Sequence, residues 1–194
     1  MKLDLLAIAP HPDDVELTCG GTMAKMADAG YRTGILDLTR GETGTRGTPE
    51  TRLREAARAG KILGVKVRRN LGLPDAHLRV CEEHKAAIAE VIRELEPRTV
   101  VLPYWEGRHP DHYTSSILGY EACFIAGLKN YPPSGRGVQA LQDHLCGCLR
   151  AGDAHVCRGH HQVLREAQEG DSVLRVAIPA AQEGARPKGQ LATR

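Results

Sequence analysis

Short apolar runs alternate with helix-length segments along the first two thirds of this chain, and no other feature restricts the fold as strongly. Leu3–Ala9 and Thr99–Leu102 are short and mostly apolar, which is typical of strands buried on both faces. Between such runs lie segments with helical periodicity, such as Glu82–Leu95, whose apolar residues fall on one face. Strands separated by helices of this length predict a parallel sheet with helices on both of its faces.

The predicted fold class is therefore α/β, a Rossmann-like three-layer αβα architecture with a mostly parallel sheet. We expect strands at Leu3–Ala9, Thr33–Leu38, Val65–Asn70 and Thr99–Leu102, and helices at about Leu17–Ala29, Pro49–Gly64, Glu82–Leu95 and Tyr113–Gly127. In an open sheet of this kind, ligands bind beyond the carboxyl ends of the strands. The loops that follow the strands are therefore the places to search for a functional site.

Composition argues against several classes of partner. The 26 Lys and Arg residues nearly balance the 24 Asp and Glu residues. No basic stripe interleaved with aromatic residues is present, so we expect no nucleic-acid partner. The early apolar run Leu3–Ala9 contains Asp4, is too short to span a membrane and lacks the features of a signal peptide. We therefore predict no membrane partner and a cytoplasmic location.

Two loops rich in His and Asp follow the first and the fourth predicted strands. The first has the sequence PHPDDVE at residues 10–16, and the second has RHPDH at residues 108–112. A catalytic zinc site needs three protein ligands and one open position for water. A single His-Pro-Asp is ordinary turn chemistry, and an Asp before a helix is often an N-cap. Two such loops, each after a buried strand, favour a metal site with side chains left over for acid–base chemistry.

The same loops resemble a known family. The string PHPDDVE, followed by CGGT and later by RHPDH, resembles the PIG-L/LmbE-like N-acetylglucosaminyl deacetylases. The strings DLTRGETGTRGTPETR, AARAGKILGV and NLGLPDAHL are similar to the branch that serves bacillithiol biosynthesis. Members of that branch hydrolyse the acetamide of N-acetylglucosaminyl malate. The resemblance covers about residues 3–131.

The resemblance implies a metal set and a catalytic set. According to this resemblance, the zinc ligands are His11, Asp14 and His112, and iron(II) would also suit these ligands. Asp13 becomes the general base that takes a proton from the attacking water. His109, when protonated, would stabilise the oxyanion, with Asp111 as its orienting carboxylate.

It also implies a substrate-binding set, which we place at Arg52, Glu42, Asp75 and Arg108. Arg52 would bind the malate carboxylates bidentately, although an exposed helix arginine is the alternative interpretation. Glu42 and Asp75 would hydrogen-bond sugar hydroxyls. The partner of this site would be a small amino-sugar molecule. Glu16 would act as an N-terminal helix carboxylate or as a brace for the loop.

The last third of the chain departs from the family. All seven aromatic residues lie between Tyr31 and Tyr131. We divide the chain into a catalytic domain, residues 1–131, and an atypical, poorly ordered tail, residues 132–194. We expect no clear strand in the tail, and helices at Val138–Leu149 and Gln162–Gln168. Its spacing Cys-Gly-Cys at residues 146–148 does not match a zinc ribbon.

A swapped or disordered tail is one explanation of this departure, and a frameshift is another. Codons for residues 156–178, translated one base later, permit FVVDITKFFERRKKAILSYGSQF, which resembles the missing part of the family. We therefore hypothesise a frameshift between about Asn130 and Val138. Such a tail would leave apolar surface uncovered, which favours aggregation or a homo-oligomer.

Several functions stay open at this point. The first is a zinc-dependent hydrolase that removes acetyl from an N-acetylglucosaminide, with N-acetylglucosaminyl malate as the leading substrate. Its rivals are a deacetylase of another conjugate, such as a chitooligosaccharide or an inositol conjugate, and a defective product that binds metal or sugar without turnover. A redox or metal-storage protein built on the cysteines of the tail is the weakest alternative.

Overall fold

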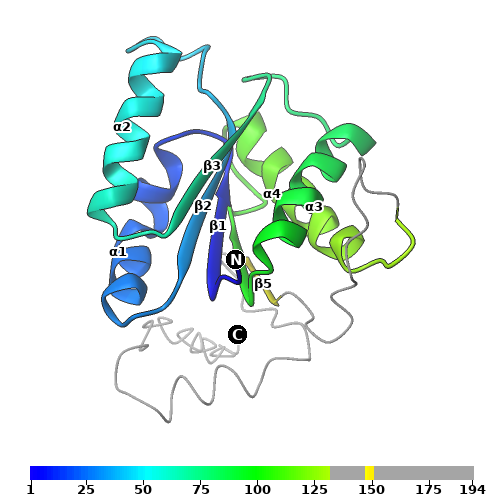
Figure 1. Ribbon diagram of the computed structural model, residues 1–194. Coiled ribbons are helices and arrows are strands. Elements are labelled where there is room, and N and C mark those ends of the chain that lie inside the picture. The colour runs from blue at the N-terminus through cyan, green and yellow to red at the C-terminus, as the bar shows by residue number, and fades with distance from the viewer. Residues whose placement is uncertain (132–146, 151–194) are drawn as a thin grey trace, which may run out of the picture. The chain divides into compact units, whose positions relative to one another are not determined.

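The computed structural model describes residues 1–131 and 147–150 of the 194-residue chain, and the described residues belong to one compact unit. Helices and strands alternate along it (Figure 1). The strands are β1 (Leu5–Ala9), β2 (Thr33–Thr39), β3 (Val67–Leu73), β4 (Thr99–Leu102) and β5 (Gly147–Arg150). The helices are α1 (Asp14–Asp28), α2 (Pro49–Ile62), α3 (Glu82–Leu95) and α4 (Pro110–Ala126).

The described strands form a single parallel sheet in the order β3-β2-β1-β4-β5. The chain moves outward from β1 to β3 on one side and then returns to place β4 on the other side of β1. Leu5 pairs with both Thr33 of β2 and Thr99 of β4, so β1 lies at the point where the strand order reverses. A crevice for ligands is expected beyond the carboxyl ends of β1 and β4.

Helices cover both faces of the sheet, with α1 and α2 on one side and α3 and α4 on the other (Figure 1). Alternate residues of each strand enter two separate cores, because successive side chains in a strand point to opposite faces. Leu6 and Ile8 pack in the core under α3 and α4, whereas Leu5, Ala7 and Ala9 pack in the core under α1. The predicted α/β class, with a parallel sheet between two helical layers, is confirmed.

Most predicted elements are confirmed, and their ends differ where local geometry intervenes. The predicted bounds of α3 and β4 match the structure. Helix α1 begins at Asp14, earlier than predicted. A non-helical residue, Cys19, separates this first turn from the longer helix behind it, which lies close to the predicted range. Strand β3 ends later than predicted, because Leu73 still pairs with Thr39 after a shift in register, and Gly72 supplies the positive φ near that shift.

Strand β5 is the clearest difference from the sequence-based expectation. Residues 147–150 pair in parallel with β4, within the tail for which we expect no strand and partly within the predicted helix at Val138–Leu149. Pairing along β4 uses backbone groups, which any extended segment can supply whatever its side-chain pattern. The helix at Gln162–Gln168, the frameshift hypothesis and the rest of the tail lie outside the described residues. The division at residue 131 stays a prediction.

Candidate metal centre

The loop after β1 is held by its neighbours in the sheet. The Pro10 carbonyl accepts hydrogen bonds from the backbone N–H of Thr39, at 2.8 Å, and from its hydroxyl, at 3.0 Å. Within the loop, both the backbone N–H and the Nδ1 of His11 contact the Oδ2 of Asp14, at 3.0 and 2.9 Å. This loop therefore presents an imidazole and a carboxylate that already face each other.

The loop after β4 brings two further imidazoles to the same place. His109 is the N-cap of α4, and its Nδ1 accepts the backbone N–H of Asp111 at 3.2 Å. His112, in the first turn of α4, places its Nε2 3.3 Å from the Oδ1 of Asp14. The ring of His11 lies 4.9 Å from that of His109 and 5.4 Å from that of His112. The two loops thus meet beyond the neighbouring strands β1 and β4.

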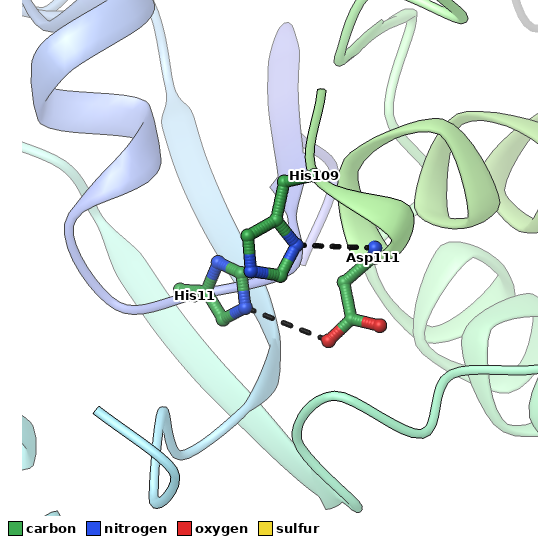
Figure 2. Close-up of side chains that lie close together, drawn as sticks. All are labelled: His11, His109 and Asp111. Carbon is green, nitrogen blue, oxygen red and sulfur yellow. Dashed lines mark hydrogen bonds and ion pairs between the residues drawn. The ribbon is translucent and has the colours of Figure 1, made fainter. Parts of the chain in front are cut away.

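Two overlapping groups in the described part of the chain could hold a metal ion, each with its ligand atoms within 4.8 Å of one another. One is the predicted set of His11, Asp14 and His112. The other is His11, His109 and Asp111, which Figure 2 shows converging from the two loops. Two imidazole nitrogens and one carboxylate oxygen match the ligands that zinc takes in catalytic sites, with a fourth position left for water. The predicted set therefore fits a catalytic zinc ion.

Electrostatics in the predicted set couples Asp14 to both histidines. Burial by itself would lower the pKa of His11, but the hydrogen bond and charge of Asp14 outweigh burial and raise it. Burial likewise acts to raise the pKa of Asp14, and the hydrogen bond from His11 and the charge of His112 reverse that effect and lower it. Burial lowers the pKa of His112, against the attraction of Asp14. An ionised Asp14 and a neutral His112 are the forms that bind a metal.

Two carboxylates lie behind His11, on the side away from Asp14. The Nε2 of His11 is 3.1 Å from the Oδ1 of Asp75 and 3.6 Å from the Oδ2 of Asp111. Asp75 and Asp111 are only 4% and 1% exposed. Nδ1 of His11 faces the metal set, so its Nε2–H can donate a hydrogen bond to Asp75. The same arrangement of carboxylate, histidine and metal occurs in many metalloenzymes.

Asp75 is buried, and its hydrogen-bond partners belong to the protein. Its Oδ2 accepts from the Thr43 hydroxyl at 2.6 Å and from the Thr43 backbone N–H at 2.9 Å. Its Oδ1 accepts the Ala76 N–H at 2.9 Å. Glu42 accepts the backbone N–H of Asp75 at 2.9 Å, so this carboxylate braces the same turn. The pKa of Asp75 is lowered, because the hydrogen bonds from Thr43 outweigh the effect of burial.

Asp111 also contacts His109 differently from our expectation. The contact runs from the backbone N–H of Asp111 to Nδ1 of His109 (Figure 2). The Asp111 carboxylate instead accepts the Ala76 N–H at 2.8 Å. Because Nδ1 of His109 is an acceptor here, the neutral ring carries its proton on Nε2. His109 can thus donate a hydrogen bond from Nε2 without being positively charged.

Asp13 and Arg52 form an ion pair at the open side of the site. The Asp13 carboxylate is 60% exposed, in contrast to the buried Asp75, and lies 3.1 Å from Nη2 of Arg52. Arg52 also donates to the Gly41 carbonyl at 3.0 Å. A Cβ at Gly41 or Gly44 would lie 2.6 or 2.5 Å from the Arg52 guanidinium, so this loop leaves room for it only because both residues are glycine.

The two arginines predicted to bind substrate differ in their exposure. Arg52 is not the exposed helix arginine of the alternative interpretation, since its guanidinium faces the site. Arg108 is exposed and precedes His109 in the loop. Sequence reasoning missed Thr43, which anchors Asp75, and Arg68, which binds the carboxylate of Glu16. No local signal singles out Arg68, because the neighbouring Arg69 of the same edge strand is also charged and is exposed.

Residues 6–123 match the PIG-L family, described as GlcNAc-PI de-N-acetylase. That match covers more than half of the chain, so the chain belongs to the PIG-L family of deacetylases. The family resemblance drawn from the two His/Asp loops is confirmed.

Individual relatives carry related activities in their names. A diacetylchitobiose deacetylase of Thermococcus kodakarensis is 38% identical over 138 residues, covering 66% of this chain and 51% of that protein. A probable N-acetyl-α-D-glucosaminyl L-malate deacetylase 2 of Bacillus cereus is 32% identical over 125 residues, covering 58% and 57%. The crystal structure of the conserved protein TT1542 from Thermus thermophilus is 49% identical, with a TM-score of 0.67 and coverage of 71% and 63%. The chain spans about half the length of the Thermococcus relative.

Proposed function

We propose that this chain is a metal-dependent N-deacetylase that releases acetate from an N-acetylglucosamine conjugate. The observation that carries the proposal is the meeting of His11, Asp14 and His112, with the exposed carboxylate of Asp13 next to them in the chain. A zinc ion held by the three ligands would polarise the amide carbonyl and lower the pKa of water from about 16 to near 7. Iron(II) suits the same ligands.

The side chains around this set supply the remaining chemistry. Asp13 accepts a proton from the water that attacks the carbonyl carbon, and returns it to the amine nitrogen as the C–N bond breaks. His109 donates a hydrogen bond from Nε2 to the oxyanion that forms on the carbonyl oxygen. Asp75 holds His11 by accepting a hydrogen bond from its Nε2, at 3.1 Å. The products are acetate and the free amine.

We place an anionic or hydroxyl-rich part of the substrate near Arg52, Glu42 and Arg108. N-acetylglucosaminyl malate is our leading substrate, since Arg52 can bind a carboxylate once its pairing with Asp13 is exchanged. The names of the relatives support an N-acetylated glucosamine in general. A chitooligosaccharide or an inositol conjugate is the alternative substrate, and a chain without turnover is the alternative outcome.

Acetate release by the purified, zinc-loaded chain tests this proposal. N-acetylglucosaminyl malate and N,N′-diacetylchitobiose would be compared side by side, with His112→Ala as the control without a metal set. Release from the malate conjugate alone would support the finer assignment, and release from chitobiose alone would contradict it. A zinc-bound chain that releases acetate from neither, while a version with the tail in the shifted frame does, would identify this chain as a defective copy.

Location and assembly stay predictions. Among the described residues, no helix has the length and apolar character needed to cross a bilayer. The cytoplasmic location and the homo-oligomer that we expect rest on the sequence alone.

A further inference from the structure

A buried guanidinium lies behind the loop that carries the candidate ligands. Arg68 belongs to β3, and its side chain is only 10% exposed. It points to the face of the sheet covered by α1 and α2, because the neighbouring Val67 packs against the opposite core. Arg68 has no place in the metal set or in the predicted substrate-binding set, so its burial calls for a separate reason.

All five N–H groups of Arg68 have acceptors. Its Nε and Nη2 form a fork on the carboxylate of Asp37, at 2.8 and 2.9 Å. Its Nη1 donates to Glu16 and, at 3.1 Å, to the Ala56 carbonyl. Its Nη2 also donates to the Pro12 carbonyl at 2.7 Å. A planar group with five donors in a rigid fork can satisfy this set of acceptors, whereas an ammonium has three donors and no fork.

Two of these contacts are made with residues 10–16, the loop and first helical turn that carry His11, Asp13 and Asp14. The Pro12 carbonyl belongs to the peptide unit that joins Pro12 to Asp13, so its hydrogen bond fixes the plane of the backbone that leads into Asp13. Glu16 lies in the first turn of α1, two residues after Asp14. One guanidinium therefore ties both sides of the ligand-bearing loop to the sheet.

The other contacts hold the guanidinium itself in place. Asp37 lies on β2 and is 1% exposed, so the fork fixes Arg68 to the interior of the sheet. Charge-assisted hydrogen bonds of this kind are about twice as strong as neutral ones and are directional. The loop is thus braced against a rigid element and not against another loop.

We propose that Arg68 is a positioning residue for the deacetylation site, acting through the Pro12 carbonyl and Glu16 on the loop that carries His11, Asp13 and Asp14. The inference rests on the proposed function, since those three residues matter only if they bind the metal and activate water. Catalytic groups lose about 100-fold in rate when they are displaced by about 1 Å. Metal affinity falls by about 10-fold to 100-fold when the support of a ligand is removed.

The test compares Arg68→Lys with Arg69→Lys in the full chain. Arg69 is the next residue of β3, but its side chain is 48% exposed and pairs with the equally exposed Glu94, so it is a matched control. Zinc affinity would be measured by competition with a chromophoric chelator, and kcat and KM with N-acetylglucosaminyl malate. For Arg68→Lys we expect zinc affinity to fall about tenfold and kcat about 100-fold, with little change in KM. Arg69→Lys should stay within about twofold of the wild type.

A second pair of variants covers the case in which Arg68→Lys does not fold. Arg68→Met combined with Asp37→Asn removes both charges of the Arg68–Asp37 pair and leaves the partly exposed Glu16 without its Arg68 contact. Asp37→Asn alone is its reference. A weaker zinc affinity in the double variant than in Asp37→Asn would support the proposal. Equal zinc affinity and equal kcat in folded protein would overturn it. A wild-type chain that binds no zinc would overturn the proposed function, and this inference with it.

Discussion

Replacing Asp75 with asparagine should weaken metal binding about tenfold and leave KM nearly unchanged. The structure sets this expectation, because the Asp75 carboxylate is 4% exposed and faces Nε2 of His11 at 3.1 Å. A carboxylate that orients a metal-binding histidine acts on the metal. A carboxylate that binds sugar hydroxyls, as we first expect from the sequence, acts on the substrate. The two roles therefore predict changes in different measured constants.

The magnitude follows from the hydrogen bonds that an amide can replace. Asparagine has one acceptor oxygen, and at the position of Oδ1 that oxygen keeps the N–H of Ala76 and the Nε2 of His11. The amide nitrogen then faces the backbone N–H of Thr43, which loses its acceptor. Because Thr43 is an exposed residue, the lost hydrogen bond costs about 0.5–1.5 kcal/mol of folding free energy. In the opposite orientation the amide nitrogen would face Nε2 of His11 and the Ala76 N–H. Only the Ala76 N–H would keep an acceptor, the Asp111 carboxylate at 2.8 Å, so the contact with His11 would be lost and this orientation is disfavoured.

The effect on the metal comes from the lost charge. A hydrogen bond to a charged group contributes about 1.5–3 kcal/mol and a neutral one about 0.5–1.5 kcal/mol. The difference of about 1–1.5 kcal/mol corresponds to about a tenfold change in an equilibrium constant. Zinc affinity would be measured by chelator competition, and the folding free energy by urea unfolding of the metal-free protein.

Thr43→Ala is the matched control for this variant. It removes the hydroxyl that donates to Asp75 at 2.6 Å but keeps the backbone N–H, so it should reduce stability without changing zinc affinity. An Asp75→Asn protein with zinc affinity within about twofold of the wild type and a KM raised about tenfold would refute the reasoning and restore the substrate-binding role.

Three further predictions test the site and its support. Asp13→Asn should keep the metal and lower kcat by about 100-fold to 10,000-fold, whereas His112→Ala should lose metal and turnover together. Zinc content and acetate release measure both effects. A His112→Ala protein that retains the metal and near-normal turnover would contradict the ligand assignment. Burial raises the pKa of Asp37 from 3.8 to about 6, so its contribution to stability is present below about pH 4 and is lost as the pH rises through about 6. Urea unfolding of the metal-free protein at several pH values should show this loss in the wild type but not in Asp37→Asn, and parallel pH profiles would count against it. Arg93→Met should lower the unfolding free energy by about 2–4 kcal/mol, because the buried Arg93 donates hydrogen bonds of 2.9 to 3.1 Å to carbonyls at and just after the end of α4. An equal loss in Arg98→Met, which replaces an exposed arginine, would point to a nonspecific effect of charge.

Much of the fold follows from patterns that are local in the chain. Helix α3 and strand β4 were predicted at their observed bounds, because an amphipathic period and an apolar run that ends at Pro103 are properties of neighbouring residues. Strand β5 was missed for the opposite reason. Its four residues, 147–150, pair with β4 through backbone groups, and no pattern in their side chains marks a strand.

The candidate site also has parts that local sequence patterns predict and parts that they do not. The pairing of His11 with Asp14 spans three residues, so the motif itself determines that an imidazole and a carboxylate face each other. The motifs also placed His112 in a second loop at a strand end. The parallel sheet then brings the two loops together, since β1 and β4 are neighbours. These parts of the site required only the alternation of strands and helices and a rule for where such sheets bind ligands.

The sequence by itself thus determined the α/β class and the two His/Asp loops, and it predicted the chemical type of the site. Only the tertiary structure decided which groups support that site. Asp75 reaches His11 across 64 positions of the chain, and Arg68 reaches Pro12 across 56. Local periodicity carries no information about such contacts, because they depend on the order in which strands assemble and on which face each side chain takes. The roles that we propose for Asp75, Asp111 and Arg68 depend on that assembly.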